Sequence, residues 1–251
     1  MKTLAIVTGA SKGLGLALSE QLIRNGHTVI TVARQNQISR ISELAATSGA
    51  QHIHYAADLS DMAQVTALCK KLTPLLQAPA QRYLLINNAG TLGPMAQYHG
   101  LEASLSSQIA QTFNLNIAAV ITLSSHFLSV CEAHRDSKIQ VINISSGAAR
   151  NAYPGWGVYC ASKAALDRYS EVAQLEAPFA QIVSLAPGVI DTDMQANIRA
   201  SNEEDFPNLQ RFKDLHANQA LSPAEETAQK ILAYSQHADF GKQTLSDIRL
   251  I

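Results

Sequence analysis

The sequence predicts a single α/β domain built on a doubly wound parallel sheet, with a small helical lid over the crevice at one edge of that sheet. Short runs rich in β-branched residues alternate along the 251 residues with longer amphipathic stretches. The short runs show almost no polar alternation, which is typical of strands buried on both faces. No Pro-, Gly- or Ser-rich linker divides the chain, so residues 1–251 are interpreted as one domain.

The predicted elements follow one another in the order strand, helix, strand. Because helices of ten or more residues separate the strands, the connections are expected to be right-handed crossovers between parallel neighbours. The last helix carries a start signal, in which Ser222 caps it, Pro223 occupies the first turn and Glu225 completes Ser-x-x-Glu. The strands are expected at 4–8, 28–33, 52–56, 83–87, 139–145 and 181–186, and the helices at 14–25, 39–47, 62–76, 105–133, 159–176 and 224–236.

Residues 193–220 break this alternation. They hold a polar stretch at 202–207 and then an amphipathic stretch at 209–215, which together predict a loop with one or two short helices. Inserts beyond the carboxyl ends of a parallel sheet tend to cover the ligand crevice, so we expect a lid here. The alternative is a solvated surface helix.

Composition excludes several classes of protein. Apolar residues make up 47% of the chain, charged residues 16%, and the net charge is −1, which argues against a disordered chain and a general nucleic-acid coat. No run of 18 apolar residues is present, so neither a membrane span nor a membrane partner is expected. Cys69, Cys131 and Cys160 are odd in number and far apart in sequence, which supports neither a disulfide framework nor a Cys-x-x-Cys zinc site, and a cytoplasmic protein is expected. His52 and His54 share a strand face, but no third ligand is suggested, so no metal is predicted.

A glycine-rich turn directly follows the first strand. Residues 8–15 read Thr-Gly-Ala-Ser-Lys-Gly-Leu-Gly, between a buried strand and an amphipathic helix. Gly9 permits a tight turn, Gly13 lets the backbone approach a pyrophosphate, and Gly15 lets the helix pack on the strand. The free N–H groups and positive dipole end of the helix then face the phosphates. This context predicts a Rossmann-type dinucleotide site more strongly than an ordinary turn.

The chain resembles the short-chain dehydrogenase/reductase family at motifs spread over most of its length. The glycine spacing with Thr8 in front, Asn-Asn-Ala-Gly at 87–90, and Tyr159-x-x-x-Lys163 with Ser146 thirteen residues before the tyrosine all match that family. The resemblance implies an oxidoreductase that acts on carbonyl or hydroxyl groups with a nicotinamide cofactor. It implies cofactor contacts by Gly9, Ser11, Lys12, Gly13, Leu14, Gly15, Arg34, Asp58, Leu59, Asn88, Ala89, Gly90, Tyr159, Lys163, Pro187, Gly188, Ile190 and Thr192.

The end of the second strand indicates NADP(H). An NAD enzyme usually carries an acid there, whereas this strand ends in Ala33 and Arg34. Arg34 can bind a 2′-phosphate through several donors, and Lys12 is a second cation within the glycine turn. The alternative is that both side chains are simply solvated. Asp58, assigned to the adenine contact with Leu59, could instead cap the helix that follows.

Four residues are expected to carry the chemistry. Tyr159 and Lys163, four apart on one helix, share a face, and Tyr159 would donate the proton that the nascent alkoxide needs. Lys163 would lower the pKa of Tyr159 and hold the nicotinamide ribose. Ser146 would polarise the substrate oxygen, and Asn116 would anchor a water that relays protons to Lys163. Tyr-x-x-x-Lys alone is common on amphipathic helices, but the accompanying motifs favour a catalytic group.

Two longer segments, 155–163 and 186–195, look like the sepiapterin reductase branch and its microbial relatives, the benzil reductases. The segments 211–213 and 221–223 are also similar to those relatives. This resemblance implies NADPH-dependent reduction of one carbonyl of a vicinal diketone. Asp247 falls near the aspartate that holds the pterin in sepiapterin reductases, although a solvated aspartate is an equal alternative. The expected substrate contacts are Ser146, Tyr153, Trp156, Tyr159, Met194 and Asp247.

Two other functions stay open. One is a 3-oxoacyl-carrier-protein reductase or another short-chain alcohol dehydrogenase, but the chain lacks that reductase's Asp-Gly-Gly ending, and no cationic entrance for a phosphopantetheine carrier is evident. The other is a dinucleotide-sensing module without catalysis, which would be expected to lose the Tyr/Lys pair. The resemblance also implies a homodimer that packs through the helices at 105–133 and 159–176. It implies a small carbonyl compound as the substrate.

Overall fold

The computed structural model describes residues 2–35 and 39–251. These residues form a seven-stranded sheet in the order β3-β2-β1-β4-β5-β6-β7, with every pair of neighbours parallel. The order reverses between β1 and β4, where a doubly wound sheet opens a crevice at its carboxyl ends. The predicted fold is therefore confirmed. The strands are β1 (Thr3–Thr8), β2 (Thr28–Ala33), β3 (His52–Ala56), β4 (Arg82–Asn87), β5 (Lys138–Ile144), β6 (Gln181–Ala186) and β7 (Leu245–Asp247).

The short strand β7 is absent from the predicted elements. It pairs with β6 over only three residues, Ser184 to Leu245 through Ala186 to Asp247. Its sequence, Leu-Ser-Asp, has no run of β-branched residues, so nothing local marks it as a strand. Pairing with the edge of β6 creates it, and that pairing brings the end of the chain to the crevice.

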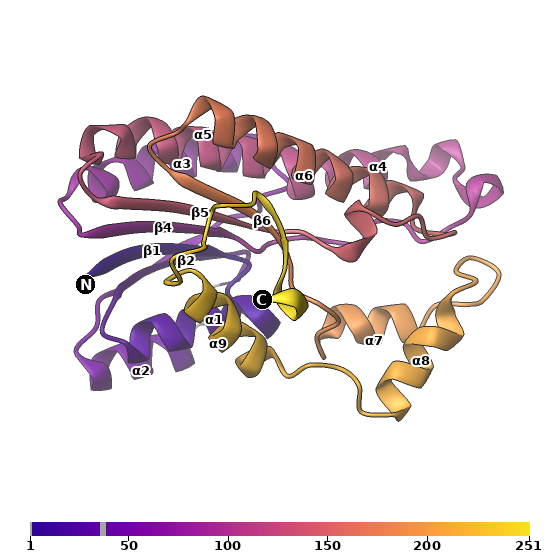
Figure 1. Ribbon diagram of the computed structural model, residues 1–251. Helices are drawn as coiled ribbons and strands as arrows, with labels where there is room; N and C mark the ends of the chain where they lie inside the picture. The colour runs from indigo at the N-terminus through magenta and orange to yellow at the C-terminus, as the bar shows by residue number, and fades with distance from the viewer. Residues whose placement is uncertain (1, 36–38) are drawn as a thin grey trace.

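Helices cover both faces of the sheet (Figure 1). One apolar core lies between the sheet and α1, α2 and α9, and a second lies between the sheet and α3, α5 and α6. Each helix lies within two residues of its predicted bounds at both ends, except the long one described next. The helices of the two layers are α1 (Gly13–Arg24), α2 (Ser39–Ser48), α3 (Met62–Gln77), α4 (Ser106–Phe113), α5 (Ala119–Cys131), α6 (Gly157–Glu176) and α9 (Ala224–Tyr234), with short 3₁₀ turns at Tyr98–Gly100, Ala103–Leu105, Glu132–His134, Gly147–Ala149 and Ile248–Leu250.

The helix predicted at 105–133 consists of α4, a π-helical turn at Asn114–Ala118, and α5. Within the described chain, the continuous helical stretch Ala103–His134 is long and apolar enough to cross a membrane, so the expectation that no such segment exists is wrong. Core helices of soluble proteins meet the same criterion. Here Leu123, Phe127 and Cys131 are buried in the core beneath the sheet face that α3 also covers.

The predicted cap of α9 is wrong. Pro223 occupies the N-cap position and the helix begins at Ala224. Ser222 instead pairs through its backbone with the segment after β6, donating to the Val189 carbonyl at 2.9 Å and accepting from the Asp191 amide at 3.0 Å. Ser222 therefore forms a backbone bridge with Ile190 and does not cap the helix.

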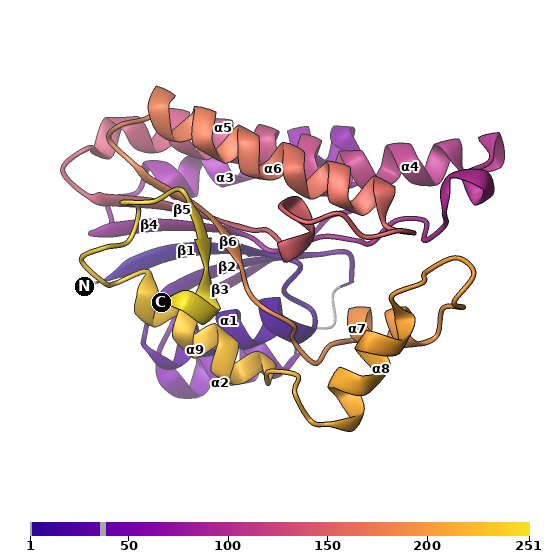
Figure 2. The ribbon, with the colours of Figure 1, turned by 45° about the vertical axis from the view of Figure 1, so that its right-hand side comes forward.

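The same bridge closes the base of the insert between β6 and α9. As predicted, the insert is a loop with two short helices, α7 (Asp193–Arg199) and α8 (Leu209–Ala217). Both helices lie beyond the carboxyl ends of the strands, apart from the two helical layers (Figure 2). Because its two ends are joined, the insert projects as one unit over the crevice.

Candidate active site

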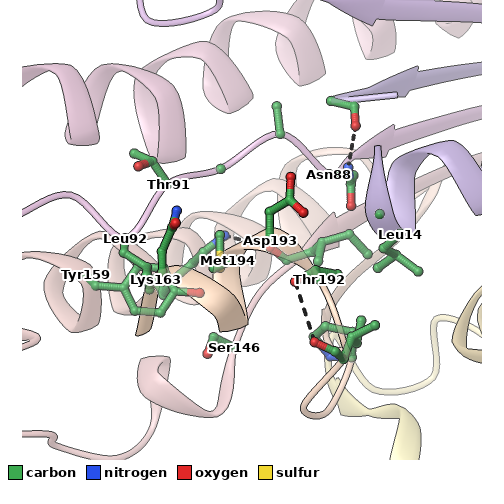
Figure 3. A pocket seen from close by; sticks show the side chains of 18 of the residues that line it. Leu14, Asn88, Thr91, Leu92, Ser146, Tyr159, Lys163, Thr192, Asp193 and Met194 are labelled. Carbon is green, nitrogen blue, oxygen red and sulfur yellow. Dashed lines mark hydrogen bonds between the residues drawn. The ribbon is translucent and has the colours of Figure 1, made fainter. Parts of the chain in front are cut away.

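A cavity of about 990 Å³ lies at the carboxyl ends of the strands, beneath the lid. It runs from the glycine turn after β1 to the first turns of α6, and Figure 3 shows the side chains gathered around it. The predicted site residues that line it are Gly9, Ser11, Lys12, Gly13, Leu14, Arg34, Asp58, Leu59, Asn88, Ala89, Gly90, Ser146, Tyr153, Trp156, Tyr159, Lys163, Pro187, Gly188, Ile190, Thr192 and Met194.

Three predicted residues do not line the cavity. A Cβ at Gly15 would stand 2.3 Å from the Gly9 carbonyl oxygen, so this glycine packs α1 against the turn, as expected for the third glycine. Asn116 is fully buried behind the cavity wall. Asp247 lies at the end of β7, and its neighbour Arg249 lines the cavity in its place.

The glycine turn has the shape that a bound pyrophosphate needs. Gly9 and Gly13 have φ values of +66° and +55°, a region that other residues rarely adopt. No side chain caps the N-terminus of α1, so its first amides remain free to meet an anion. Asn88 fastens the turn to β4 by donating from Nδ2 to the Thr8 carbonyl at 3.0 Å. The residues present therefore fit a dinucleotide.

Two cations lie at the end of the cavity where the 2′-phosphate is expected. Arg34 follows the last residue of β2, and Lys12 precedes α1. Lys12 Nζ forms an exposed ion pair with Asp193 on the first turn of α7, at 2.7 Å. Asp58 lines the same cavity, and its carboxylate accepts from the Ser60 amide at 2.9 Å.

Asp58 does not cap α3. That position belongs to Asp61, whose side chain accepts from the amides of Ala63 and Gln64. Asp58 lies three positions before Asp61, and it lines the cavity. The alternative role for Asp58 is therefore wrong, and an adenine contact stays a prediction.

Tyr159 and Lys163 share a buried face of α6 at the other end of the cavity (Figure 3). Lys163 Nζ lies 6.0 Å from the centre of the Tyr159 ring and donates to the Ile144 carbonyl at 2.8 Å. Burial lowers the pKa of Lys163 to about 8, while Asp167 acts in the opposite direction. The lysine is thus a titrating group near neutral pH.

The pKa of Tyr159 is raised, and the dominant cause is burial, with a side-chain hydrogen bond to Ser146 acting against it. A lowering of the Tyr159 pKa by Lys163 stays a prediction. Desolvation disfavours the phenolate because Tyr159 is only 6% exposed. The consequence is a phenol that keeps its proton at neutral pH, which suits a proton donor.

Asn116 lies in the π-helical turn between α4 and α5, a type of irregularity that is frequent at functional sites. Its Nδ2 donates to the Thr91 carbonyl at 2.8 Å and to Ser162 Oγ at 3.0 Å, and its Oδ1 accepts from the Thr91 amide at 2.9 Å. A Cβ at Gly90 would lie 3.3 Å from that oxygen and 3.5 Å from Lys163 Nζ. Asn116 thus lies beside the lysine, and a water relay stays a prediction.

An aromatic cluster forms the wall next to Tyr159. The Trp156 ring lies 5.5 Å from that of Tyr159 and 5.4 Å from that of Tyr153, centre to centre. From the lid, Phe206 stacks on Trp156 at 4.6 Å and Phe212 lies 5.3 Å away. The wall therefore consists of residues that precede or begin α6 together with residues of the lid.

The remaining candidates from the sequence are His52, His54 and Cys160. His52 and His54 both face Thr31 Oγ1, at 2.8 and 3.0 Å, and no cluster of three metal-ligating side chains occurs among residues 2–35 and 39–251. Cys160 packs against the aromatic cluster, as predicted.

Comparison with known proteins decides the family. The model of the short chain dehydrogenase family matches residues 3–203. The chain belongs to the short-chain dehydrogenase family. It is 36% identical over 232 residues to a benzil reductase ((S)-benzoin forming) of Bacillus cereus, covering 90% of this chain and 91% of the relative. It is 34% identical over 245 residues to sepiapterin reductase of Mus musculus, covering 94% and 92%.

Solved structures agree with this assignment. The chain is similar to the KRED1-Pglu enzyme with a TM-score of 0.81 and 28% identity, covering 97% of this chain and 99% of that one. As a short-chain dehydrogenase, the protein is an oxidoreductase of a family that binds a nicotinamide dinucleotide. The cavity that joins the glycine turn to Tyr159 is where the sequence predicts that cofactor.

The prediction missed several residues of this short-chain dehydrogenase that line the cavity. Thr91 and Leu92 directly follow the Asn-Asn-Ala-Gly motif, so extending that motif by two residues would have found them. Arg211, Phe212 and Arg249 line the cavity from α8 and from the last turn of the chain. No local pattern marks these two arginines as cavity residues.

Proposed function

We propose that this protein is an NADPH-dependent carbonyl reductase that transfers hydride to one carbonyl of a vicinal diketone. The observation that carries the proposal is the aromatic wall of Tyr153, Trp156 and Phe212 beside Tyr159, in the cavity that reaches the glycine turn. An apolar, aromatic wall favours a ketone flanked by a ring. A second carbonyl next to the first makes its carbon more electrophilic.

The side chains supply the proton and its environment. The nicotinamide, when bound, supplies the hydride. Tyr159 donates its phenolic proton to the oxygen of the reduced carbonyl, and the raised pKa of Tyr159 keeps that proton available. Ser146, which follows β5 and interacts with Tyr159, orients the carbonyl oxygen. The protonated Lys163 stabilises the tyrosinate that remains.

The choice of NADPH rests on the charges at the end of β2. Ala33 and Arg34 occupy the positions where an acid would repel a 2′-phosphate, and both line the cavity. Lys12 adds a second cation, although Asp193 shares it. The two relatives support the substrate class, because their names record reduction of benzil and of sepiapterin.

A side-by-side assay tests the proposal. We expect NADPH oxidation with benzil and 1-phenyl-1,2-propanedione, and each product to be the hydroxyketone with no diol. Sepiapterin and acetoacetyl-coenzyme A are the comparison substrates, measured as kcat/KM. A thioester that exceeds benzil and sepiapterin by about tenfold would indicate a 3-oxoacyl reductase instead. NADPH binding without turnover of any ketone would favour a sensing module.

We also propose that the protein acts in the cytoplasm as a homodimer. The apolar side chains Ile121, Val172 and Leu175 are exposed on α5 and α6, the helices through which the family resemblance implies dimerisation. Light scattering on the purified protein gives its mass. Leu175→Glu places a charge on this face and is expected to dissociate the dimer, whereas Lys213→Glu on α8 leaves the mass unchanged.

A further inference from the structure

Two arginines from distant parts of the chain line the same cavity as the catalytic group. Arg211 comes from the lid helix α8, and Arg249 comes from the last 3₁₀ turn, Ile248–Leu250. The carboxylates on the described cavity wall are Asp58 and Asp193, and both belong to the cofactor end, since one follows β3 and the other pairs with Lys12. The arginines therefore bring positive charge to the rest of the cavity wall, with the charge of Arg249 partly offset by Asp247.

Arg249 is held in a defined orientation by Asp247. The Asp247 carboxylate accepts from Arg249 Nε at 2.9 Å and from Nη2 at 2.5 Å. A guanidinium has five N–H donors, and these contacts occupy only one of its edges. The edge formed by Nη1 and the second Nη2 hydrogen stays available for another planar acceptor pair, such as a carboxylate. The Asp247 side chain is 11% exposed and that of Arg249 is 60% exposed, so the arginine is the accessible partner.

The stem of Arg249 lies next to the Pro-Gly segment after β6. A Cβ at Gly188 would lie 3.4 Å from Arg249 Cδ, so the arginine covers the glycine on the cavity wall. Arg211 is exposed on the lid, next to Phe212 of the aromatic wall. Arg211 and Arg249 thus each bring a positively charged hydrogen-bond donor to the cavity, one from the lid and one from the end of the chain. A neutral diketone has no negatively charged group that could pair with either arginine.

We propose that Arg249, oriented by Asp247, and Arg211 are specificity-determining residues that bind a carboxylate of the substrate. This inference rests on the proposed carbonyl reductase function and extends its substrate class from neutral vicinal diketones to aromatic ketones that carry a carboxylate. The reaction is unchanged, since hydride adds to the ketone carbon, Tyr159 protonates the oxygen, NADPH becomes NADP⁺, and the carboxylate keeps its charge. Asp247 is a positioning residue, because it acts through Arg249.

Matched acids and methyl esters test this assignment. Benzoylformate and 3-benzoylpropionate are each compared with their methyl esters, which keep the shape and remove the charge. We expect kcat/KM to favour the acid in at least one pair by about tenfold or more, as a charge-assisted hydrogen bond would give. Raising the salt concentration is expected to slow the acid and leave the ester unaffected.

The variants Arg249→Gln and Arg211→Gln are each expected to lower this acid preference, by about tenfold for Arg249, with little change for the ester. Lys213→Gln is the matched control, because Lys213 is an exposed cation on α8 that does not line the cavity. An ester preferred in both pairs, or an acid preference that both arginine variants keep, overturns the inference. A large loss of NADPH affinity with an unchanged acid preference would assign Arg249 to the cofactor and overturn it as well.

A binding titration tests the role of the two arginines without any catalytic turnover. Trp156 is the chain's one tryptophan and lines the cavity, so its fluorescence reports ligands there. We expect benzoate to bind more tightly than benzamide, and the difference to vanish in Arg249→Gln. If no ketone is reduced, the proposed function fails, and this titration still decides whether the arginines bind a carboxylate. Equal binding of the two ligands would count against the inference.

Discussion

Trp156 and Phe206 stack with their ring centres 4.6 Å apart and their planes 13° from parallel. Trp156 immediately precedes α6, which carries Tyr159, and Phe206 lies in the turn between α7 and α8 of the lid. The backbones approach closely at the same place, because a Cβ at Gly155 would lie 2.1 Å from the Asp205 carbonyl oxygen. Through this contact, the position of the lid is coupled to the helix that carries the catalytic tyrosine.

Removing the Phe206 ring is therefore expected to loosen the lid. Phe206→Ala deletes a fully buried ring, which typically costs about 3–5 kcal/mol of local or global stability. We expect a raised KM for benzil and a red-shifted Trp156 emission as water reaches the indole. Phe240→Ala is the control, because Phe240 is equally buried but packs on Tyr234 in the other core. An unchanged emission in Phe206→Ala would contradict the coupling.

Arg34 is expected to determine the preference for NADPH. Arg34→Ala removes the cation at the end of β2, so affinity for NADPH should fall about tenfold or more while affinity for NADH changes little. Arg40→Ala serves as a nearby control, since Arg40 pairs with Glu20 and does not line the main cavity. Both cofactors are titrated against each variant. Equal losses for the two cofactors would remove Arg34 from the phosphate site.

Tyr159→Phe separates chemistry from binding. The substitution keeps the ring that packs against Trp156 and deletes only the proton donor. Turnover of benzil is expected to fall by at least about a thousandfold, which lies within the range for loss of a general acid. The dissociation constant for NADPH should stay within about threefold of the original. A comparable loss of cofactor affinity would show that Tyr159 mainly binds the cofactor.

The pH dependence follows from two buried groups. Burial lowers the pKa of Lys163 to about 8 and raises that of Tyr159. Below pH 7 both groups carry their protons, which is the state that reduction needs. Above about pH 8 the lysine loses its charge, so kcat/KM for reduction is expected to fall about tenfold per pH unit. A rate that still rises at pH 9 would mean that charged Lys163 is not required.

The buried Asp167 carboxylate on α6 is expected to contribute to the stability of the protein. Asp167 accepts hydrogen bonds from Ser145 and Ser184, both at 2.6 Å, and from Arg150 Nε at 2.8 Å. Asp167→Ala leaves these donors unpaired, so the free energy of unfolding should fall by roughly 3–5 kcal/mol. Glu171→Ala breaks only the more exposed pair with Arg168 and should cost less than about 1 kcal/mol. Urea unfolding compares the two, and similar midpoints would contradict the argument.

Local patterns explain why much of the site was predictable. Gly9 and Gly13 are needed for their positive φ values, and Gly15 is needed for the close packing of the helix on the turn. All three lie within seven residues, so their spacing can be recognised from a short stretch of sequence. Tyr159 and Lys163 share a face because four residues complete about one helical turn. The π-helical turn around Asn116 was not predictable, because nothing in the apolar pattern of 105–133 distinguishes it from regular helix.

The sequence by itself determined the order of the strands and helices up to α9, the glycine turn, and the shared helix face of Tyr159 and Lys163, because periodicity and short-range spacing encode them. Only the tertiary structure decided the direction of the pKa of Tyr159, since burial depends on the whole core. It alone decided that Asp247 holds Arg249, and that Arg249 and Arg211 line one cavity. Those contacts depend on where β7 pairs and how the lid folds back, and these are long-range events with no local signature.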